Sequence, residues 1–319
     1  MIEKNLLSEK PLWDGDFVDA HQHFWDPNVN YHPWLSKDSL IPFRYGDYSP
    51  IKRRYLPDDY QKEAKGFNVR ETVYVETEWD PSDPVGEVRY ATALNHTYGL
   101  PSAIVAQAWL DAPNAEEILR QQAGFPLVRS IRHKPKTIEK KSAAGGLMTQ
   151  MSDERWRRGY AMLESLGLHF DLQVSWRFIE EAICLAKDFP KTLIILNHTG
   201  LPENRCEDVL KGWHAAMSKL AECPNVMVKI SGLGILGESW KIEKNDWIVK
   251  ETIKMYGAER CMFASNFPVD SLCGTFADII YGFKQISAVF DKKIQASLFC
   301  NTARAVYRTS EVAVEIADG

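Results

Sequence analysis

The chain has no long hydrophobic run and little excess charge of either sign. No apolar stretch approaches the roughly 20 residues of a membrane-spanning helix, and the first five residues lack a basic region followed by an apolar core. We therefore expect a soluble, cytoplasmic protein without a membrane partner. The formal net charge is only -5, and the Lys and Arg residues are dispersed, which argues against a nucleic-acid partner. Small molecules are the class of partner that this composition favours.

The sequence also lacks the cysteine and glycine patterns of two common kinds of site. Its six cysteines lie in the second half without any Cys-x-x-Cys spacing, which argues against a disulfide framework or a zinc knuckle. No glycine-rich fingerprint follows the first predicted strand, which argues against a nucleotide-binding doubly wound sheet. No internal repeat, low-complexity tract or clear linker interrupts the chain.

Short apolar runs alternate with amphipathic stretches along the chain. The predicted strands are 17–21, 72–78, 103–110, 128–133, 168–174, 192–197, 226–230 and 261–265. The predicted helices are 58–66, 86–98, 115–123, 153–166, 177–189, 207–222, 239–256 and 275–290. Eight such units in 319 residues predict an α/β fold, a (β/α)8 TIM barrel. We expect one domain over 1–319, with 1–16 as an N-terminal extension; an open doubly wound sheet is the alternative.

A His-x-His pair, His21 and His23, ends the first predicted strand. Side chains alternate along a strand, so both imidazoles point to the same side and converge on one spot. Imidazole nitrogens bind metals and carry protons. Two surface histidines in a polar loop are the simpler alternative. The apolar residues before the pair and the aromatic residues after it favour a partly buried functional site.

Polar side chains recur at the carboxyl ends of the predicted strands, which all face one mouth in a barrel. His198 is the most telling after the first pair, because it ends a buried apolar run and its ring would cost about 1–3 kcal/mol to bury without a partner. Four tryptophans near strand ends either line an aromatic pocket or pack in the core. The polar set comprises His21, His23, Glu76, Glu78, Asp111, Arg132, His133, Gln173, His198, Lys229, Ser231, Asn266 and Asp270, and the tryptophans are Trp34, Trp79, Trp109 and Trp176.

Several motifs in order carry a resemblance to a known family. They are residues 19–25 (DAHQHFW) with 31–35 (YHPWL), 128–133 (VRSIRH), 170–174 (FDLQV), 197–202 (NHTGLP) and 262–270 (MFASNFPVD). Through them the chain resembles the amidohydrolase superfamily, specifically the amidohydrolase-2 group with its sugar-acid lactonases and 2-pyrone-4,6-dicarboxylate lactonase. The resemblance spans nearly the whole chain. It implies a distorted (β/α)8 barrel with the site at the mouth, and usually hydrolysis of a lactone or related ester.

The resemblance also implies roles for individual residues. By position, His21, His23 and His198 would hold a divalent metal, Zn²⁺ or Mn²⁺, or polarise the substrate carbonyl directly, because some members of the group bind a metal and others bind none. Arg132 would capture a substrate carboxylate, since a planar guanidinium suits bidentate binding. A structural cation tied to a neighbouring Asp is the alternative for Arg132. The other substrate-binding candidates are His133, Glu78 and Gln173.

Asn266 departs from the family pattern. Most members have Asp there, and its carboxylate takes a proton from the attacking water and later delivers it to the leaving oxygen. An amide cannot carry that proton. The role then passes to another group, or the hydrolytic activity has been lost or exchanged. The candidate substitutes are Asp270, Glu78, Asp111 and an imidazole.

The working hypothesis is a hydrolase that opens the lactone of a sugar acid or dicarboxylic acid by water attack at the barrel mouth. Its small-molecule substrate would be an anionic or polyhydroxy lactone. Two alternatives stay open. One is a carbon–carbon lyase that decarboxylates a small carboxylic acid, because such decarboxylases share the barrel and the His-x-His start. The other is a non-catalytic ligand-binding derivative, for which Asn266 is the best support. The sequence also leaves open whether the protein forms a homo-oligomer.

Overall fold

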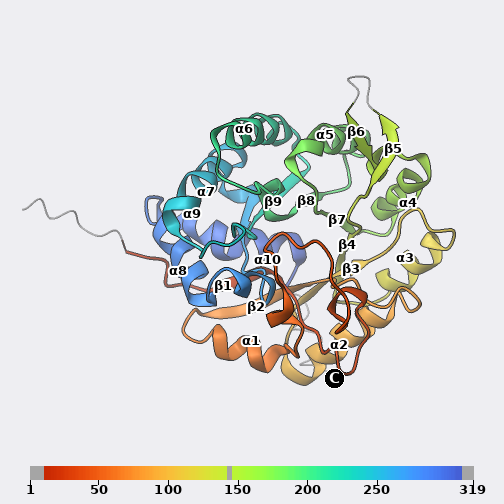
Figure 1. The fold of residues 1–319 in the computed structure, drawn as a ribbon, viewed down its shortest axis with the longest axis horizontal. Helices are drawn as coiled ribbons and strands as arrows, with labels where there is room; N and C mark the ends of the chain where they lie inside the picture. Colours follow the sequence, from red (N-terminus) through yellow and green to blue (C-terminus); the bar gives the residue numbers. More distant parts are fainter. Residues whose placement is uncertain (1–10, 142–145, 311–319) are drawn as a thin grey trace, which may run out of the picture.

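A computed structural model describes residues 11–141 and 146–310 as a single eight-stranded barrel (Figure 1). The sheet order is β1–β2–β3–β4–β7–β8–β9–β10, and all neighbouring strands are parallel. A parallel bridge between Gln22 and Phe267 joins the two edges and closes the barrel. The strands are β1 (Phe17–Gln22), β2 (Val69–Val75), β3 (Ala103–Gln107), β4 (Val128–Arg132), β7 (His169–Leu172), β8 (Ile194–Leu196), β9 (Val226–Ile230) and β10 (Cys261–Phe263).

Helices surround the strands and cover the outer face of the sheet. The helix α4, for example, buries Trp156, Tyr160 and Leu163, and it begins where the Asp153 side chain accepts hydrogen bonds from two backbone amides of the first turn. None of the described helices is both long and apolar enough to cross a membrane. The helices are α1 (Pro57–Glu63), α2 (Gly86–Tyr98), α3 (Ala115–Ala123), α4 (Glu154–Ser165), α5 (Ile179–Asp188), α6 (Glu207–Ala221), α7 (Ile242–Tyr256), α8 (Phe276–Ser287), α9 (Lys292–Ala296) and α10 (Thr302–Tyr307).

The predicted barrel is confirmed, but several strands end earlier at the mouth than the apolar pattern suggested. The strand β2 ends at Val75 rather than at Glu78, and β3 ends at Gln107 rather than at Leu110. Glu78 has a φ of 53°, a left-handed conformation in which a strand cannot continue. The helices α9 and α10 were not predicted. Of the predicted N-terminal extension, residues 1–10 lie outside the described residues.

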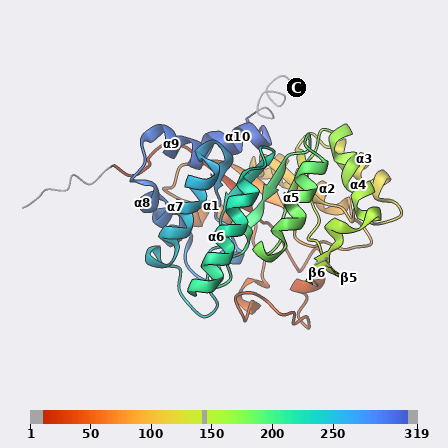
Figure 2. The same cartoon turned by 90° about the horizontal axis from the view of Figure 1, so that it is seen from above.

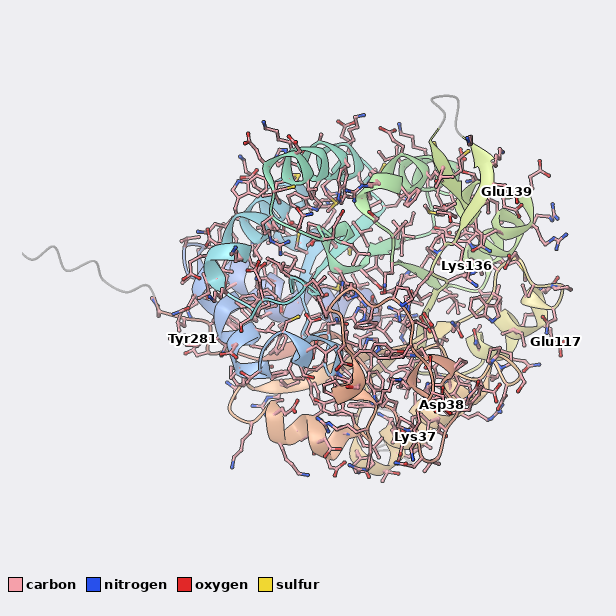
Figure 3. The ribbon with its side chains drawn as sticks, in the orientation of Figure 1. Lys37, Asp38, Glu117, Lys136, Glu139 and Tyr281 are labelled. Atoms are coloured by element: carbon pink, nitrogen blue, oxygen red, sulfur yellow. The ribbon has the colours of Figure 1, made fainter. Side chains whose placement is uncertain are left out.

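Two insertions cover the mouth. The first is residues 23–56, here called the mouth segment, which contains two short 3-10 turns, Pro33–Leu35 and Ser49–Ile51. The second is the hairpin of β5 (Thr137–Lys141) and β6 (Leu147–Thr149), which the sequence did not reveal. Figure 2 shows both at one end of the barrel, with α9 and α10 at the opposite end. In Figure 3, Lys37 and Asp38 mark an exposed turn of the mouth segment, and Glu139 marks the hairpin.

The opposite end of the barrel is closed by α10. The Tyr307 hydroxyl donates to the two carboxylate oxygens of Asp171, at 3.1 and 2.9 Å. The Lys229 ammonium lies 2.6 Å from the same carboxylate and 4.8 Å from the centre of the Tyr307 ring. All three side chains are buried. The barrel interior therefore holds an ion pair that the Tyr307 ring covers at this end.

Candidate active site

A cavity of about 290 Å³ opens at the mouth. This volume is at the lower end of the roughly 300–1,000 Å³ of ligand pockets, which suits a small ligand. The mouth segment supplies aromatic and aliphatic wall residues, and the strand ends supply polar ones. Of the residues proposed from the sequence, those that line the cavity are His23, Trp34, Glu76, Glu78, Arg132, Gln173, His198 and Asn266.

The three proposed histidines form one buried cluster. The ring centre of His21 lies 4.9 Å from that of His23 and 4.6 Å from that of His198. Burial, reinforced by nearby positive charge, holds the pKa values of His21 and His198 well below their usual range and lowers the pKa of His23 to about 3. All three imidazoles are therefore neutral near pH 7, and each has a nitrogen lone pair.

Hydrogen bonds fix two of these rings. The Nδ1 of His23 lies 2.7 Å from the backbone oxygen of Val75, which only accepts, so the proton of this neutral ring is on Nδ1, and its Nε2 lies 3.3 Å from Asn266 Oδ1. The Nδ1 of His198 lies 2.9 Å from the Ser231 hydroxyl. Neither ring nitrogen of His21 has a hydrogen-bond partner within the described part of the chain. The cluster thus presents lone pairs that a ligand or a proton can occupy.

A metal ion does not fit this arrangement. In the segments 11–141 and 146–310, no group of three or more His, Cys, Asp or Glu side chains is placed to hold one. Tetrahedral zinc sites need three or four such ligands at about 2.0–2.3 Å. The histidine cluster therefore lacks the geometry of the metal site that the family resemblance implies, and we derive no chemical step through a metal.

Asn266, on the cavity wall, pairs with Asp270, which lies behind it. The Asn266 amide nitrogen donates to Asp270 Oδ1 at 2.6 Å, and the Tyr45 hydroxyl donates to the same oxygen at 3.0 Å. Burial raises the pKa of the Asp270 carboxyl, although the nearby Arg44 guanidinium opposes this shift. Asp270 is 1% exposed and does not line the cavity. It therefore orients Asn266 and the mouth segment and does not face a ligand directly.

Backbone strain concentrates at this site. Five of the seven described non-glycine residues with positive φ lie at the barrel mouth, on the segments that follow three of the strands. Such conformations cost about 1–3 kcal/mol each and persist where the surrounding structure enforces them. In this protein they turn the cavity-lining side chains inward directly after the strands end. The five are Glu78, His198, Thr199, Leu201 and Asn266.

Arg132 lines the cavity, and its guanidinium is buried and held by neighbouring side chains. Its Nε donates to Glu76 Oε1 at 2.5 Å, its Nη2 donates to the Glu76 backbone oxygen at 2.6 Å, and its Nη1 donates to Gln173 Oε1 at 2.9 Å. Both charged side chains are almost fully buried. The structure therefore favours the structural alternative for Arg132, with a glutamate in place of the expected aspartate. Gln173 is held by the same network.

Three other candidates lie in different environments. The Nδ1 of His133 accepts hydrogen bonds from the Trp156 indole at 2.9 Å and from the Leu110 backbone amide at 3.2 Å, and His133 is absent from the cavity wall. Asp111 accepts from the Gln150 side chain and is also absent from that wall. These contacts assign structural roles to both residues. Glu78 does line the cavity, in an ion pair with Lys134.

The sequence reasoning missed Arg44 and Phe43 as parts of this site. Both belong to the mouth segment and line the cavity. The Phe43 ring stacks on Trp34, with centroids 5.9 Å apart, and the Trp34 indole donates to the Thr77 backbone oxygen at 2.7 Å. Trp34 and Trp25 had a sequence signal, through the motifs at 31–35 and 19–25. Arg44 stands in a stretch without any periodic pattern.

Comparison with known proteins identifies the family of this chain. A family model described as amidohydrolase matches residues 18–309. The chain belongs to the amidohydrolase family. Sinorhizobium fredii y4mH is 36% identical over 92% of this chain and 99% of its own length, and Burkholderia ambifaria L-fucono-1,5-lactonase is 26% identical over 82% and 83%. Membership of the amidohydrolase family supports hydrolysis of an ester bond.

Solved structures of amidohydrolases share the fold. A Burkholderia multivorans amidohydrolase with bound zinc is 21% identical, with a TM-score of 0.74 over 92% of this chain and 99% of that one. A 2,6-dihydroxybenzoate decarboxylase from Rhizobium is 14% identical, with a TM-score of 0.59 over 93% and 100%. The barrel alone therefore does not separate a hydrolase from a lyase, and the site must decide.

Proposed function

We propose that this protein is a lactonase that opens a small polyhydroxy lactone by attack of water at the barrel mouth. The observation that carries the proposal is a neutral imidazole, His198, on the wall of a small cavity that also contains cationic and amide donors. A lactone needs a group that accepts the proton of water and a donor for the carbonyl oxygen. The L-fucono-1,5-lactonase relatives support the same reaction class.

The charges of the cavity favour a polyhydroxy lactone over a dicarboxylate. Each cation that lines the cavity in the described chain already faces an acidic partner: Arg132 faces Glu76, Lys134 faces Glu78, and Arg44 faces Asp270. A dicarboxylate could use Arg44, whose contact is long, but would have to displace at least one of the close pairings of Arg132 and Lys134. A polyhydroxy ring instead uses paired carboxylates and amides as hydrogen-bond partners and packs its apolar face on the aromatic wall.

We assign the proton-accepting role to His198. In the tautomer whose Nδ1 donates to the Ser231 hydroxyl, the Nε2 of His198 is free to accept a proton from water. Burial, followed by the positive charges of Arg44 and Arg132, lowers the pKa of His198 and makes the ring a weak base. A negative charge that develops beside it favours its protonated form and so offsets the cost of burial. In the opening step His198 therefore takes the proton from water as the anion forms. It then gives this proton to the departing ring oxygen of the lactone.

Proton release measured with a pH indicator tests the proposal. The panel contains sugar 1,4- and 1,5-lactones and one dicarboxylate lactone, each with and without added Zn²⁺ because a relative binds this ion. We expect release from at least one sugar lactone. We also expect His198→Gln to abolish most of the activity, while the control His96→Gln, at an exposed position on α2, leaves it unchanged.

The same panel distinguishes the rival activities. Release of CO₂ from small aromatic acids without any lactone hydrolysis would favour the lyase. Tight binding of sugar acids without turnover of any compound would favour the non-catalytic ligand-binding derivative. Either result would refute the lactonase proposal.

A further inference from the structure

We infer that Arg44 stabilises the oxyanion that forms on the lactone carbonyl. This inference rests on the proposed lactonase function and names the group that the reaction requires beside His198. A guanidinium is always charged and carries five N–H donors in a fixed plane. It is therefore suited to an oxygen that gains negative charge during the reaction.

The other cavity cations are committed to close partners. Arg132 is 2% exposed, and its Nε, Nη1 and Nη2 all donate to Glu76 or Gln173 at 2.5–2.9 Å. Lys134 donates to Glu78 at the rim of the cavity. Moving either cation toward a substrate would leave a carboxylate without its partner, which is most costly at the buried Glu76.

Arg44 is less constrained. Its side chain is 28% exposed, and its Nη2 lies 3.5 Å from Asp270 Oδ1, which is longer than a good hydrogen bond. Its guanidinium carbon lies 4.5 Å from the centre of the Tyr45 ring. Within the described residues these are its polar and cation–π contacts, and neither uses its N–H donors in a hydrogen bond. The donors remain available to a ligand in the cavity.

Gly232 brings Arg44 next to His198. A Cβ on Gly232 would stand 2.6 Å from His198 Nδ1 and 2.7 Å from Arg44 Nη2. Both nitrogens therefore flank the same point, and the space is available only because residue 232 is glycine, at a φ of 61°. The guanidinium is thus beside the imidazole that takes the proton.

The neighbours of Arg44 hold it in place before substrate arrives. On one side Phe43 stacks on Trp34, and on the other the Tyr45 hydroxyl donates to Asp270 at 3.0 Å. Both contacts fix the backbone of the mouth segment. A charged donor that is already positioned needs little reorganisation when the oxyanion forms, which is the condition for strong stabilisation.

The reaction step is balanced with these residues alone. The oxygen of water forms a bond to the carbonyl carbon, His198 takes one proton of that water, and the electron pair of the C=O double bond moves to the oxygen that faces Arg44. The pair then returns to form the carbonyl again, the bond between the carbon and the ring oxygen breaks, and the protonated His198 gives its proton to that oxygen. The product is a hydroxy acid, which ionises and releases one proton.

The test compares Arg44→Met and Arg44→Lys with Arg53→Met, a control at an exposed position of the same mouth segment. Removal of one oxyanion donor typically lowers kcat about 100- to 1,000-fold. We expect this loss in Arg44→Met with a KM within about threefold of wild type, partial recovery in Arg44→Lys, and unchanged kinetics in Arg53→Met. Circular dichroism verifies that each variant is folded. An active wild type with an equally active Arg44→Met would overturn the inference and leave the lactonase proposal standing.

Calorimetric binding of gluconate, a sugar-acid carboxylate, gives a second readout that does not depend on turnover. Its carboxylate carries charge where the oxyanion would form. We expect binding to the wild type and at least tenfold weaker binding to Arg44→Met. If the wild type is inactive on every lactone, the proposed function fails. In that case, Arg44-dependent gluconate binding would still support Arg44 as the residue that contacts the anion, and unaffected or absent binding would overturn it.

Discussion

Arg132→Met is expected to destabilise the protein strongly, although methionine has a similar length. The substitution removes three hydrogen bonds and leaves the Glu76 carboxylate, which is almost fully buried, without its cationic partner. Breaking a buried ion pair on one side costs about 3–5 kcal/mol. The same substitution at Arg89, which pairs with Asp83 at an exposed position on α2, is the matched control and should cost no more than about 1 kcal/mol.

The pH dependence of this loss has a definite sign. Burial raises the pKa of the Glu76 carboxyl, but Arg132 and then Lys134 outweigh burial and hold it below its ordinary 4.5. This carboxylate therefore contributes stability above that pH, and the contribution is lost as the pH falls through the lowered pKa. In Arg132→Met burial dominates and the pKa rises. The difference in unfolding free energy between wild type and variant should be largest near pH 7 and shrink toward about pH 4.

Urea unfolding of a double-mutant cycle measures the pair directly. The cycle contains Arg132→Met, Glu76→Gln and the double variant. In the double variant a neutral amide lies beside methionine, so neither position carries a buried charge. We expect the double variant to be more stable than the sum of the single losses predicts, by about 2 kcal/mol or more. Additive losses, or a loss in Arg132→Met no larger than that in Arg89→Met, would refute the assignment of Arg132 as a buried structural cation.

Three further predictions concern other groups. Gly232→Ala should lower kcat about tenfold or more, because the added Cβ would displace the adjacent imidazole and guanidinium. The control Gly237→Ala, at a φ of 73° with nothing within 4 Å of the added Cβ, should lower the free energy of unfolding by only about 1 kcal/mol. Equal kinetics in the two variants would contradict this prediction. Asn266→Asp places a second carboxyl group beside Asp270, so the variant should lose stability relative to wild type as the pH rises from about 5 to about 8. If the Tm values of the two proteins changed in parallel with pH, the result would argue against the contact. Burial, followed by a neighbouring carboxylate, raises the pKa of Glu87 from 4.5 to about 7. The free energy of unfolding of the wild type should therefore fall by about 3 kcal/mol as the pH rises through that interval, while that of Glu87→Gln should not. Urea unfolding at several pH values that gave the same pH slope for both proteins would count against this prediction.

Local patterns predicted the barrel and the histidine cluster. The pair His21 and His23 was readable because the period of two along a strand is a property of the strand itself. His198 was readable because it stops an apolar run. The ends of the strands at the mouth were less accurate, since the alternating pattern continues through Glu78 while the backbone there turns left-handed.

The roles of the arginines could not be read from the sequence. Whether a guanidinium meets substrate depends on which carboxylate lies within reach, and Glu76 reaches Arg132 from a position 56 residues earlier in the chain. Arg44 lies in a segment without periodicity. That segment is ordered by contacts between distant residues, such as the Trp25 indole, which donates to the backbone oxygens of Ile51 and Arg53 at 3.1 and 3.0 Å. Such contacts exist only after the chain has folded.

The lid formed by Tyr307 makes the closure of the barrel depend on a residue that follows its last strand. The ribosome completes all eight strands once residue 263 is made, yet the pair of Asp171 and Lys229 is covered from below only when Tyr307 follows. A nascent or prematurely terminated chain therefore carries its two interior charges at an open end, where water enters and the last strands pack incompletely.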